Sequence, residues 1–354
     1  MNRVILLSAT LTFCCIFVCC GIKMDCIQEQ KSSCDMEEVI EKVKGQMKPL
    51  DECDGTQYSD SVQRYFQYYG LDVGDDRAEH LFGTFKSDDQ ELAGHIYRPA
   101  EYKATVILLH GYLNHTGQMK HLIGYLLGQG YAVAAFDMPG HGLSKGERGS
   151  IDDFSQYSDA LRNSAKVVGG RLHGPYHLVA FSLGSGVALD YLLTSEDSIF
   201  DRIVLAAPLV RNVAWESLKT GYNVYSKLAK NIPRARRANS SDKEFLEFNR
   251  TKDILHVEKV PLKWVKVLYE WNDKIANLPR RDKAVLVIQG TSDTTVAWRY
   301  NIKFIQSKFS GVKVRMIDKG RHELFNESLN IRSKVFLQIS DYLGEQAELQ
   351  RNVL

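Results

Sequence analysis

The stretch YHLVAFSLGSGVALDYLL, residues Tyr176–Leu193, decides the fold of this chain. Its apolar first part leads directly into Ser182, and small residues typical of a helix start follow at once. A strand that turns sharply into a helix at a serine lifts the hydroxyl out of the sheet, in the turn called a nucleophile elbow. Gly184 fills the second glycine position of the usual Gly-x-Ser-x-Gly pattern, whereas Ala180 replaces the first.

A second serine matches this pattern with both glycines, at Gly142-Leu143-Ser144-Lys145-Gly146. Ser144, however, lies several residues beyond its nearest strand, in a glycine-rich segment typical of a loop. Ser182 has a strand immediately before it and a helix immediately after it. We therefore predict that Ser182 is the nucleophile and that Ser144 is a loop residue. The alternative role for Ser182 is that of a simple helix N-cap.

Apolar runs of strand length alternate with helix-like segments from residue 80 to the end of the chain. The predicted strands are His80–Phe85, Glu91–Arg98, Ala104–Leu109, Tyr131–Phe136, Tyr176–Phe181, Arg202–Ala206, Ala284–Gln289 and Val312–Ile317. This alternation predicts an α/β fold with a mainly parallel sheet and helices on both faces. Such sheets carry their chemistry at the carboxyl ends of the strands.

A serine nucleophile needs a base within hydrogen-bond reach and a carboxylate that orients the base. Asp293 and His322 each follow a predicted strand, in the order serine, acid, histidine. Of the ten histidines, only His322 lies beyond both the Ser182 and the Asp293 strands. Asp318 is the alternative acid, but it precedes His322 too closely to approach its ring easily. We predict a triad of Ser182, Asp293 and His322.

The developing negative charge of such a reaction requires hydrogen-bond donors, which form an oxyanion site. We predict the backbone amides of Leu183, directly after the nucleophile, and Tyr112, after the strand exit at His110-Gly111. We expect His110 to be a structural hydrogen-bonding residue rather than a base. His115 and His141 are expected to be turn residues.

The segment 210–283 interrupts the alternation of strands and helices. It holds 17 Lys and Arg against 9 Asp and Glu, in a chain whose net charge is only +2. It is also rich in aromatic residues and mostly helical in pattern, which predicts a helical cap over the strand ends. We divide the chain into a helical extension (residues 23–78), an α/β core (79–209 and 284–346) and this cap (210–283). The small net charge argues against a nucleic-acid partner, and no protein partner can be inferred.

The first 22 residues have the pattern of a targeting segment. Arg3 precedes an apolar stretch from Val4 to Ile22, which suits a cleaved signal peptide or an uncleaved membrane anchor. Cys20-Gly21 is also similar to a bacterial lipoprotein site, although Cys19 stands where a small residue is usual. All three alternatives predict export, to the periplasm, the medium or a membrane surface.

Cysteines are confined to the first 53 residues. Beyond the apolar segment they are Cys26, Cys34 and Cys53, which leaves an odd thiol and several alternative pairings. A catalytic body without cysteine argues against thiol or metal chemistry, so we expect no metal.

Four motifs resemble those of the α/β-hydrolases, in the monoacylglycerol lipase and lysophospholipase branch often labelled serine aminopeptidase-like. They are LLHGYLNHTG near Gly111, DMPGHGLSKGERG from Asp137, AFSLGSG around Ser182, and GTSDTTV with GRHELFNE near the end. The resemblance covers roughly residues 60 to 345. It implies an α/β-hydrolase fold and cofactor-free hydrolysis of a lysophospholipid or monoacylglycerol. The basic cap, with Pro233–Arg237, then fits either contact with a membrane surface or a solvated basic face.

Two other functions compete with this prediction. A peptidase of the same branch would need an acidic residue for the free amine of its substrate, and Glu216, Glu244 and Glu247 in the cap are candidates. A membrane-tethered binding protein with an inactive site is the non-enzymatic alternative. The presence of all three triad residues argues against it.

Overall fold

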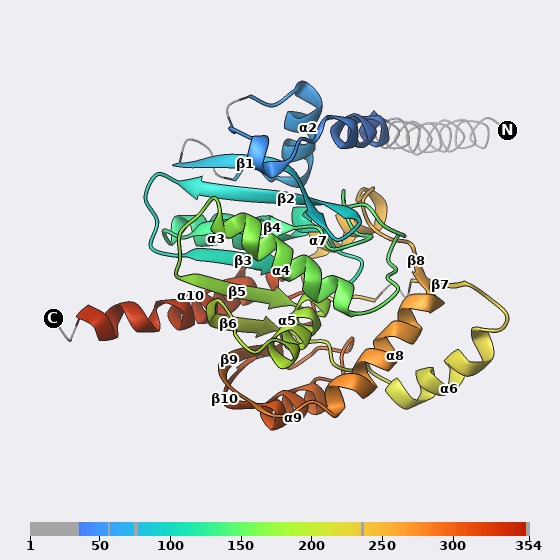
Figure 1. Cartoon of the computed structure of the whole chain (residues 1–354). Helices are drawn as coiled ribbons and strands as arrows, with labels where there is room; N and C mark the ends of the chain where they lie inside the picture. The colour runs from blue at the N-terminus through green and yellow to red at the C-terminus, as the bar shows by residue number, and fades with distance from the viewer. Residues whose placement is uncertain (1–34, 56, 74–76, 235–236, 352–354) are drawn as a thin grey trace, which may run out of the picture.

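The computed structural model describes residues 35–55, 57–73, 77–234 and 237–351, with side chains as far as residue 345. An eight-stranded sheet forms its centre, in the order β1-β2-β4-β3-β5-β6-β9-β10 (Figure 1). The strands are β1 (Ala78–Ser87), β2 (Gln90–Pro99), β3 (Thr105–Leu109), β4 (Ala132–Phe136), β5 (Tyr176–Phe181), β6 (Phe200–Ala206), β9 (Arg281–Gly290) and β10 (Phe309–Ile317). From β4 to β10 every pairing is parallel, whereas β2 pairs antiparallel with both of its neighbours, β1 and β4. The mainly parallel α/β sheet is thus confirmed.

Two hydrophobic layers cover the sheet because its central strands are apolar on both faces. All side chains of β3 and β4 are buried. On one face pack α4 (Ser155–Gly169), α5 (Leu183–Thr194) and α9 (Trp298–Lys308). On the other pack α3 (Lys120–Gly128) and α10 (Leu329–Arg351), together with the N-terminal helices. The carboxyl ends of the parallel strands lie at one edge of the sheet, between the two layers of helices.

The N-terminal extension packs against the sheet through two helices, residues 35–46 and α2 (Asp60–Tyr69). Ser59 caps α2 with its hydroxyl, and Gly70 ends it in a left-handed conformation. The buried faces of the helices include Val39, Val43, Tyr65 and Phe66. The extension is therefore part of the hydrophobic core rather than a solvated tether.

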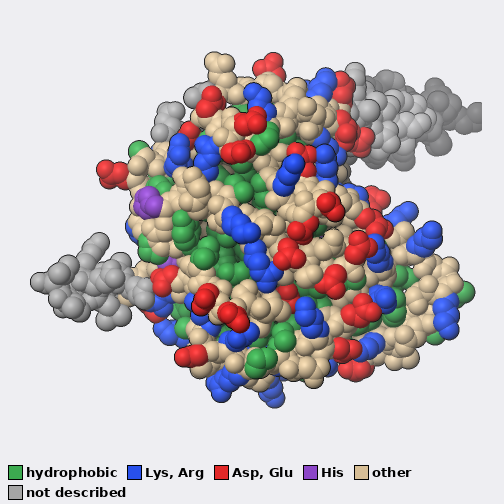
Figure 2. Space-filling view, viewed as in Figure 1, with side chains coloured by type: hydrophobic (Ala, Val, Ile, Leu, Met, Phe, Trp, Pro, Cys, Tyr) green, Lys and Arg blue, Asp and Glu red, His purple; other side chains and the backbone are tan. Residues whose placement is uncertain are grey.

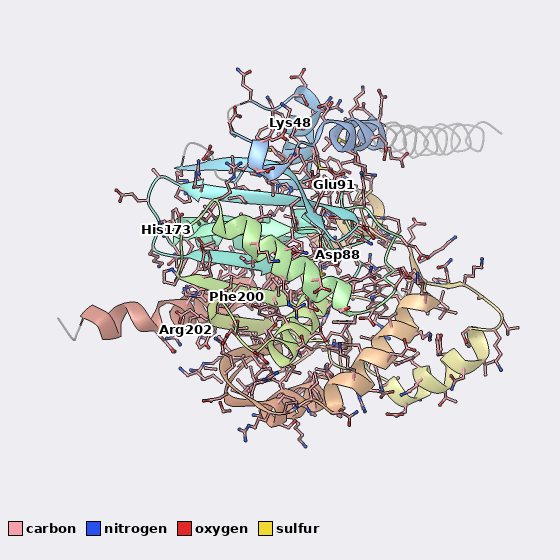
Figure 3. All side chains as sticks on the ribbon, viewed as in Figure 1. Lys48, Asp88, Glu91, His173, Phe200 and Arg202 are labelled. Atoms are coloured by element: carbon pink, nitrogen blue, oxygen red, sulfur yellow. The ribbon has the colours of Figure 1, made fainter. Side chains whose placement is uncertain are left out.

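The same extension covers the edge of the sheet at β1. Pro49 forms a parallel bridge with Thr84, and the Thr84 amide donates to the carbonyl of Lys48 at 2.7 Å. Figure 3 shows Lys48 at this edge, beyond the β1–β2 hairpin whose turn contains Asp88. Covering an edge strand satisfies backbone groups that would otherwise invite pairing with another chain.

The segment between β6 and β9, residues 210–280, lies over the strand ends. It contains α6 (Trp215–Tyr225), α7 (Lys243–Thr251) and α8 (Leu262–Ala276). It also contains a short antiparallel pair of strands, β7 (Asn231–Pro233) and β8 (Lys259–Pro261), which lie on either side of α7 in the chain and which the sequence pattern did not predict. Trp271 of α8 stacks on Phe154 at 4.1 Å, and its indole N–H donates to the buried Asp190. We call this segment the cap; through α8 it shares the hydrophobic core of the sheet.

Several element limits differ from the predictions. β9 begins at Arg281 rather than Ala284, because its first residues pair with Phe309 at the outer end of β10. The sequence pattern predicts one closing helix over Leu324–Leu343, whereas in the structure a short turn, Leu324–Asn326, precedes α10, which starts only at Leu329. Each difference falls at an element end, where local propensity is weakest.

The N-terminal predictions fall mostly outside the described residues. The targeting segment, Cys26 and Cys34 all lie there, whereas Cys53 carries a free thiol near two backbone carbonyls. Within the described part of the chain, no helix combines the length and apolar character needed to cross a membrane. The face seen in Figure 2 intersperses Lys and Arg with Asp and Glu side chains.

A buried carboxylate fastens the cap to the rest of the molecule. Asp253 accepts hydrogen bonds from Tyr69 of α2 (3.0 Å), from Nε2 of His115 (3.1 Å) and from the side-chain amide of Gln118 (2.6 Å). Burial alone raises the pKa of Asp253, but His115 and these donors outweigh it and lower the pKa to about 2. The carboxylate of Asp253 therefore connects the cap to the α/β core and to the N-terminal extension.

Replacing Asp253 should test this fastening. We expect Asp253→Ala to lower the free energy of unfolding at neutral pH by about 3 kcal/mol or more, because a buried pair loses one member. The difference in unfolding free energy between Asp253→Ala and wild type should shrink as the pH falls from about 4 towards 2. Asp253 stabilises the fold only while its carboxylate is ionised, and its pKa in the folded protein, about 2, lies below the ordinary 3.8. Urea denaturation measures both.

The matched control is Tyr69→Phe, which removes one of the donors and should cost about 1 kcal/mol. Equal stability of Asp253→Ala and wild type across this pH range would contradict the structural role of the pair.

Candidate active site

The backbone turns sharply at Ser182, between β5 and α5. Ser182 has φ 51° and ψ −110°, a conformation that costs a residue with a side chain about 1–3 kcal/mol. Hydrogen bonds hold it there: its amide donates to Ala206 of β6 at 2.9 Å, and its carbonyl accepts from Leu209 at 3.1 Å. This is the geometry of a nucleophile elbow.

Gly184 allows α5 to start this close to the sheet. A Cβ at Gly184 would lie 2.7 Å from the carbonyl oxygen and Cβ of Leu109 on β3, so no other residue fits without a shift. Ala180, in contrast, lies within β5, is fully buried, and has no positive φ. The substitution of the first glycine therefore changes packing and leaves the turn intact.

The structure brings the three predicted triad residues together from three strand ends. Nε2 of His322 lies 2.9 Å from Oγ of Ser182, and Nδ1 lies 2.8 Å from Oδ2 of Asp293. A carboxylate can only accept, so Nδ1 carries the proton and Nε2 is left to accept from the serine hydroxyl. All three side chains are buried.

Charge pairing sets the protonation of this group. Burial alone lowers the pKa of His322, but the charge of Asp293 and its hydrogen bond outweigh burial and raise the pKa above its ordinary value. Burial raises the pKa of Asp293, yet the imidazole and the amides of Thr295 and Gln289 hold it below its ordinary value. Asp293 is thus an ionised partner. Asp318 is exposed on the surface, and the ring nitrogen Nδ1 is bonded by Asp293 instead.

Ser144 lies apart from this group. Its hydroxyl donates to the carbonyl of Asp137 and accepts from the amide of Ala93 at 2.9 Å, and it is buried. The hydroxyl of Ser144 therefore uses both its donor and its acceptor to hold the loop after β4 against β2.

The predicted oxyanion donors stand beside Ser182. The Leu183 amide begins α5, and the Tyr112 amide follows the exit of β3. Neither amide donates a hydrogen bond to another residue within the described part of the chain. The Tyr112 ring stacks on Trp264 of the cap at 3.5 Å, and its hydroxyl donates to Gly149. These two contacts hold the loop that follows β3 in place.

The other nearby histidines are structural. His110 accepts from the amide of Met138 through Nε2, and burial lowers its pKa to about 4. His141 is fully buried, and burial lowers its pKa to about 3. His115 caps a short turn, as expected, but the sequence did not reveal its buried partner Asp253.

Sequence reasoning also missed Glu323, the residue after His322. This carboxylate is buried, yet it accepts hydrogen bonds from the side-chain amides of Asn114, Asn239 and Asn326 at 3.3–3.4 Å. The Glu323 amide also donates to the carbonyl of Asn239 in the cap. No local pattern signals this network, because its members come from three separate loops.

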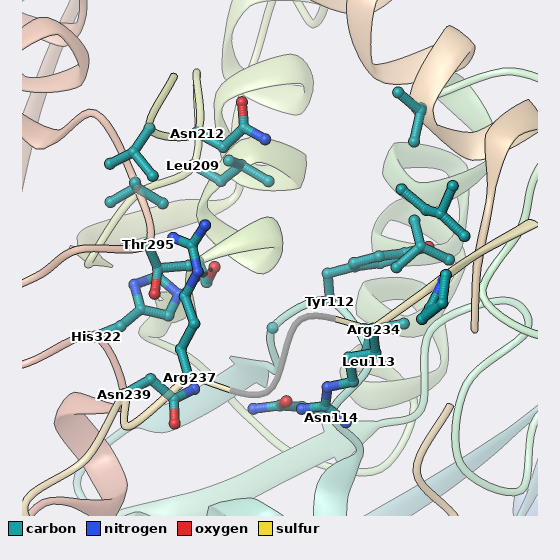
Figure 4. A pocket seen from close by; sticks show the side chains of 18 of the residues that line it. Tyr112, Leu113, Asn114, Leu209, Asn212, Arg234, Arg237, Asn239, Thr295 and His322 are labelled. Atoms are coloured by element: carbon teal, nitrogen blue, oxygen red, sulfur yellow. Dashed lines mark hydrogen bonds between the residues drawn. The ribbon is translucent and has the colours of Figure 1, made fainter. Parts of the chain in front are cut away.

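The triad opens into a cavity of about 920 Å³ between the cap and the strand ends. One wall is apolar and includes Leu209, Val213, Leu218, Val260, Val265 and Leu268. In Figure 4, His322, Thr295, Arg237 and Asn239 lie on one side, and Tyr112, Leu113, Asn114 and Arg234 on the other. Among the described residues, no three His, Cys, Asp or Glu side chains are grouped as metal ligands.

The sequence profile of the family described as "Serine aminopeptidase, S33" matches residues 100–329. The chain belongs to this family. Its relatives place it in the monoacylglycerol lipase and lysophospholipase branch of the α/β-hydrolases. It is 27% identical over 239 residues to Phospholipase YtpA of Bacillus subtilis, covering 63% of this chain and 89% of the relative. It is 25% identical to the Monoacylglycerol lipase of Mycolicibacterium smegmatis, covering 72% and 93%.

The fold of this S33-family chain is also that of solved lipases. A soluble variant of monoglyceride lipase from Saccharomyces cerevisiae superimposes with a TM-score of 0.64 at 18% identity, covering 74% of this chain and 94% of that one. The family match includes Tyr112, Ser182, Asp293, His322 and the cap, whereas the N-terminal extension with α2 lies outside it. Tyr69 therefore adds a contact to the cap from beyond the family region.

The charge pairing in the site can be tested directly. We expect the pKa of the His322 imidazole to lie above 6.5 in the wild type and to fall in Asp293→Asn, where burial remains but the neighbouring charge is lost. Histidine NMR titration measures it. The control Asp318→Asn, which removes an exposed acid of the same loop, should leave the pKa unchanged. An unchanged pKa in Asp293→Asn would show that Asp293 does not pair with His322.

Proposed function

We propose that this protein is a serine hydrolase that cleaves carboxylic esters of lipids, of the monoacylglycerol lipase or lysophospholipase type. The observation that carries the proposal is the hydrogen-bonded Ser182–His322–Asp293 group at the base of a large cavity with an apolar wall. Lipases among the relatives support the same class. No cofactor is required for this chemistry.

In the proposed mechanism, Ser182 Oγ attacks the ester carbonyl as its proton passes to Nε2 of His322. The amides of Leu183 and Tyr112 stabilise the oxyanion. The carbon–oxygen bond to the alcohol then breaks, and His322 gives its proton to the leaving oxygen. Water, deprotonated by the same imidazole, releases the acid from the acyl-enzyme. Asp293 holds the ring and stabilises its positive form.

The charges around the cavity favour a lipid ester over a peptide. Of the three acidic residues considered for binding a free amine, Glu216 and Glu244 do not line the cavity, and Glu247 forms an ion pair with Arg250 at 2.5 Å. Glu323 lines it but is already bonded to amide groups. An ammonium group would therefore have to compete with an existing partner at either carboxylate of the cavity.

Labelling with a fluorophosphonate probe tests the nucleophile. We expect the wild type and Ser144→Ala to be labelled and Ser182→Ala to remain unlabelled, with ester turnover reduced by roughly 10⁶-fold. Loss of labelling in Ser144→Ala combined with labelling of Ser182→Ala would reverse the assignment.

The reaction class can be separated with a panel of p-nitrophenyl esters, monoacylglycerols and aminoacyl anilides. We expect turnover of the esters and little of the anilides. Turnover of anilides alone would identify a peptidase. A fully folded protein without labelling or turnover would support the inactive binding protein.

We also propose that the cap contacts a membrane surface, in keeping with an export segment in residues 1–22. Leu218, Val224, Tyr225 and Leu228 are among the most exposed large apolar side chains, on and just after α6. Lys227 and Lys230 are exposed in the same segment, which suits anionic headgroups. Leu218 and Tyr225 line the cavity as well, so its opening lies beside this patch.

A charge placed on this patch should weaken access to substrate in vesicles. Leu228 is 79% exposed, and we expect Leu228→Glu to lower turnover of vesicle-embedded monoacylglycerol by about tenfold while sparing a soluble short-chain ester. The control Leu337→Glu alters an exposed leucine on α10. Equal effects of the two variants on vesicle turnover would exclude the patch as the contact.

A further inference from the structure

The cavity contains carboxylates whose charge is already balanced. Glu247 pairs with Arg250, and Glu323 is buried among the amide groups of Asn114 and Asn239. No other Asp or Glu among the described residues lines the cavity. Neither carboxylate is therefore in a position to neutralise further cations on the wall.

Four lysine and arginine side chains of the cap line the cavity, namely Arg234, Arg237, Lys243 and Arg250, and Arg250 is paired with Glu247. Nη1 of Arg237 donates to the carbonyl of Thr294 at 2.6 Å, a neutral partner in the turn that contains Asp293. Lys243 is the first residue of α7. Neither Arg237 nor Lys243 forms an ion pair with a carboxylate of the described residues, so the wall carries positive charge that the protein does not balance.

The direction of the ester bond relates these cations to the substrate. His322 must protonate the leaving oxygen, so the alcohol part of the ester lies on the His322 side of Ser182. Figure 4 shows Arg237 and Asn239 on this side of the cavity. The apolar side chains of Val260, Val265 and Leu268, which also line the cavity, suit the acyl chain. The alcohol part therefore faces Arg237.

We propose that the cavity selects an anionic lysophospholipid, an ester whose alcohol part carries a phosphate, and that Arg237 and Lys243 bind that phosphate. The inference rests on the proposed function and narrows its substrate class. An arginine with unused N–H groups suits a phosphate because it can form two parallel charge-assisted hydrogen bonds. A neutral monoacylglycerol would leave Arg237 and Lys243 without a negatively charged partner.

The test compares two substrates that share an acyl chain, decanoyl glycerol and decanoyl glycerol phosphate, both kept below their micelle concentrations. For the full-length wild type we expect kcat/KM to favour the phosphate ester by about tenfold or more, corresponding to one charge-assisted contact. The preference should decline with added salt. We expect Arg237→Gln to reduce the ratio of the two kcat/KM values about tenfold, mainly through KM, and Lys243→Gln to reduce it as well.

The matched control is Lys266→Gln, which removes the same charge from an exposed position on α8 that does not line the cavity. Its ratio should equal that of the wild type. Equal kcat/KM values for the two soluble substrates would overturn the proposal, as would a fall in the ratio as large in Lys266→Gln as in Arg237→Gln. A preference that arises only on anionic vesicles would also overturn it, because the cations would then bind the membrane surface.

Failure of the proposed function has a different signature, namely no fluorophosphonate labelling and no turnover of either ester. Binding of both lipids to Ser182→Ala, measured by calorimetry, then tests the inference by itself. Tighter binding of the phosphate lipid that is lost in the Ser182→Ala/Arg237→Gln double variant supports it. Equal affinities overturn it.

Discussion

The backbone of Ser182, held at a positive φ between a buried strand and a buried helix, is the constraint on which the site depends. Its amide and carbonyl are both bound by the β6 side of the sheet, through Ala206 and Leu209. The close approach of α5 to β3 requires a glycine at position 184. Because the surrounding core fixes this strained turn, the hydroxyl is directed at His322 before any substrate arrives.

The cap is joined to the catalytic loops by buried polar groups as well as by apolar packing. Glu323 connects the His322 loop to Asn239 of the cap and to Asn114 of the loop after β3. Asp253 connects the cap to the core and to the N-terminal extension. Buried charges persist in such positions when every acceptor is satisfied. Cavity shape and triad geometry are therefore coupled through these two carboxylates.

Much of the fold and of the candidate site could be predicted from local pattern. All eight core strands, the parallel order and the proximity of Ser182, Asp293 and His322 follow from apolar runs and from the residues that end them. The β7–β8 strand pair could not be predicted, because three-residue strands carry too little pattern. Nor could the partners of His115 and Glu323, since hydrogen bonds between distant loops leave no periodic signal.

The sequence by itself determined the order of strands and helices, and with it which residues stand at the carboxyl ends of the strands. In a parallel sheet those ends meet at one edge, so linear order is enough to bring the reacting groups together. Only the tertiary structure decided which charges remain unbalanced around them. Arg250 and Arg237 are both basic residues of one segment, yet only Arg250 has a carboxylate partner. Arg250 pairs with Glu247 within one turn of α7, whereas Arg237 reaches its partner, the carbonyl of Thr294 in the loop after β9, only when the cap folds over the sheet.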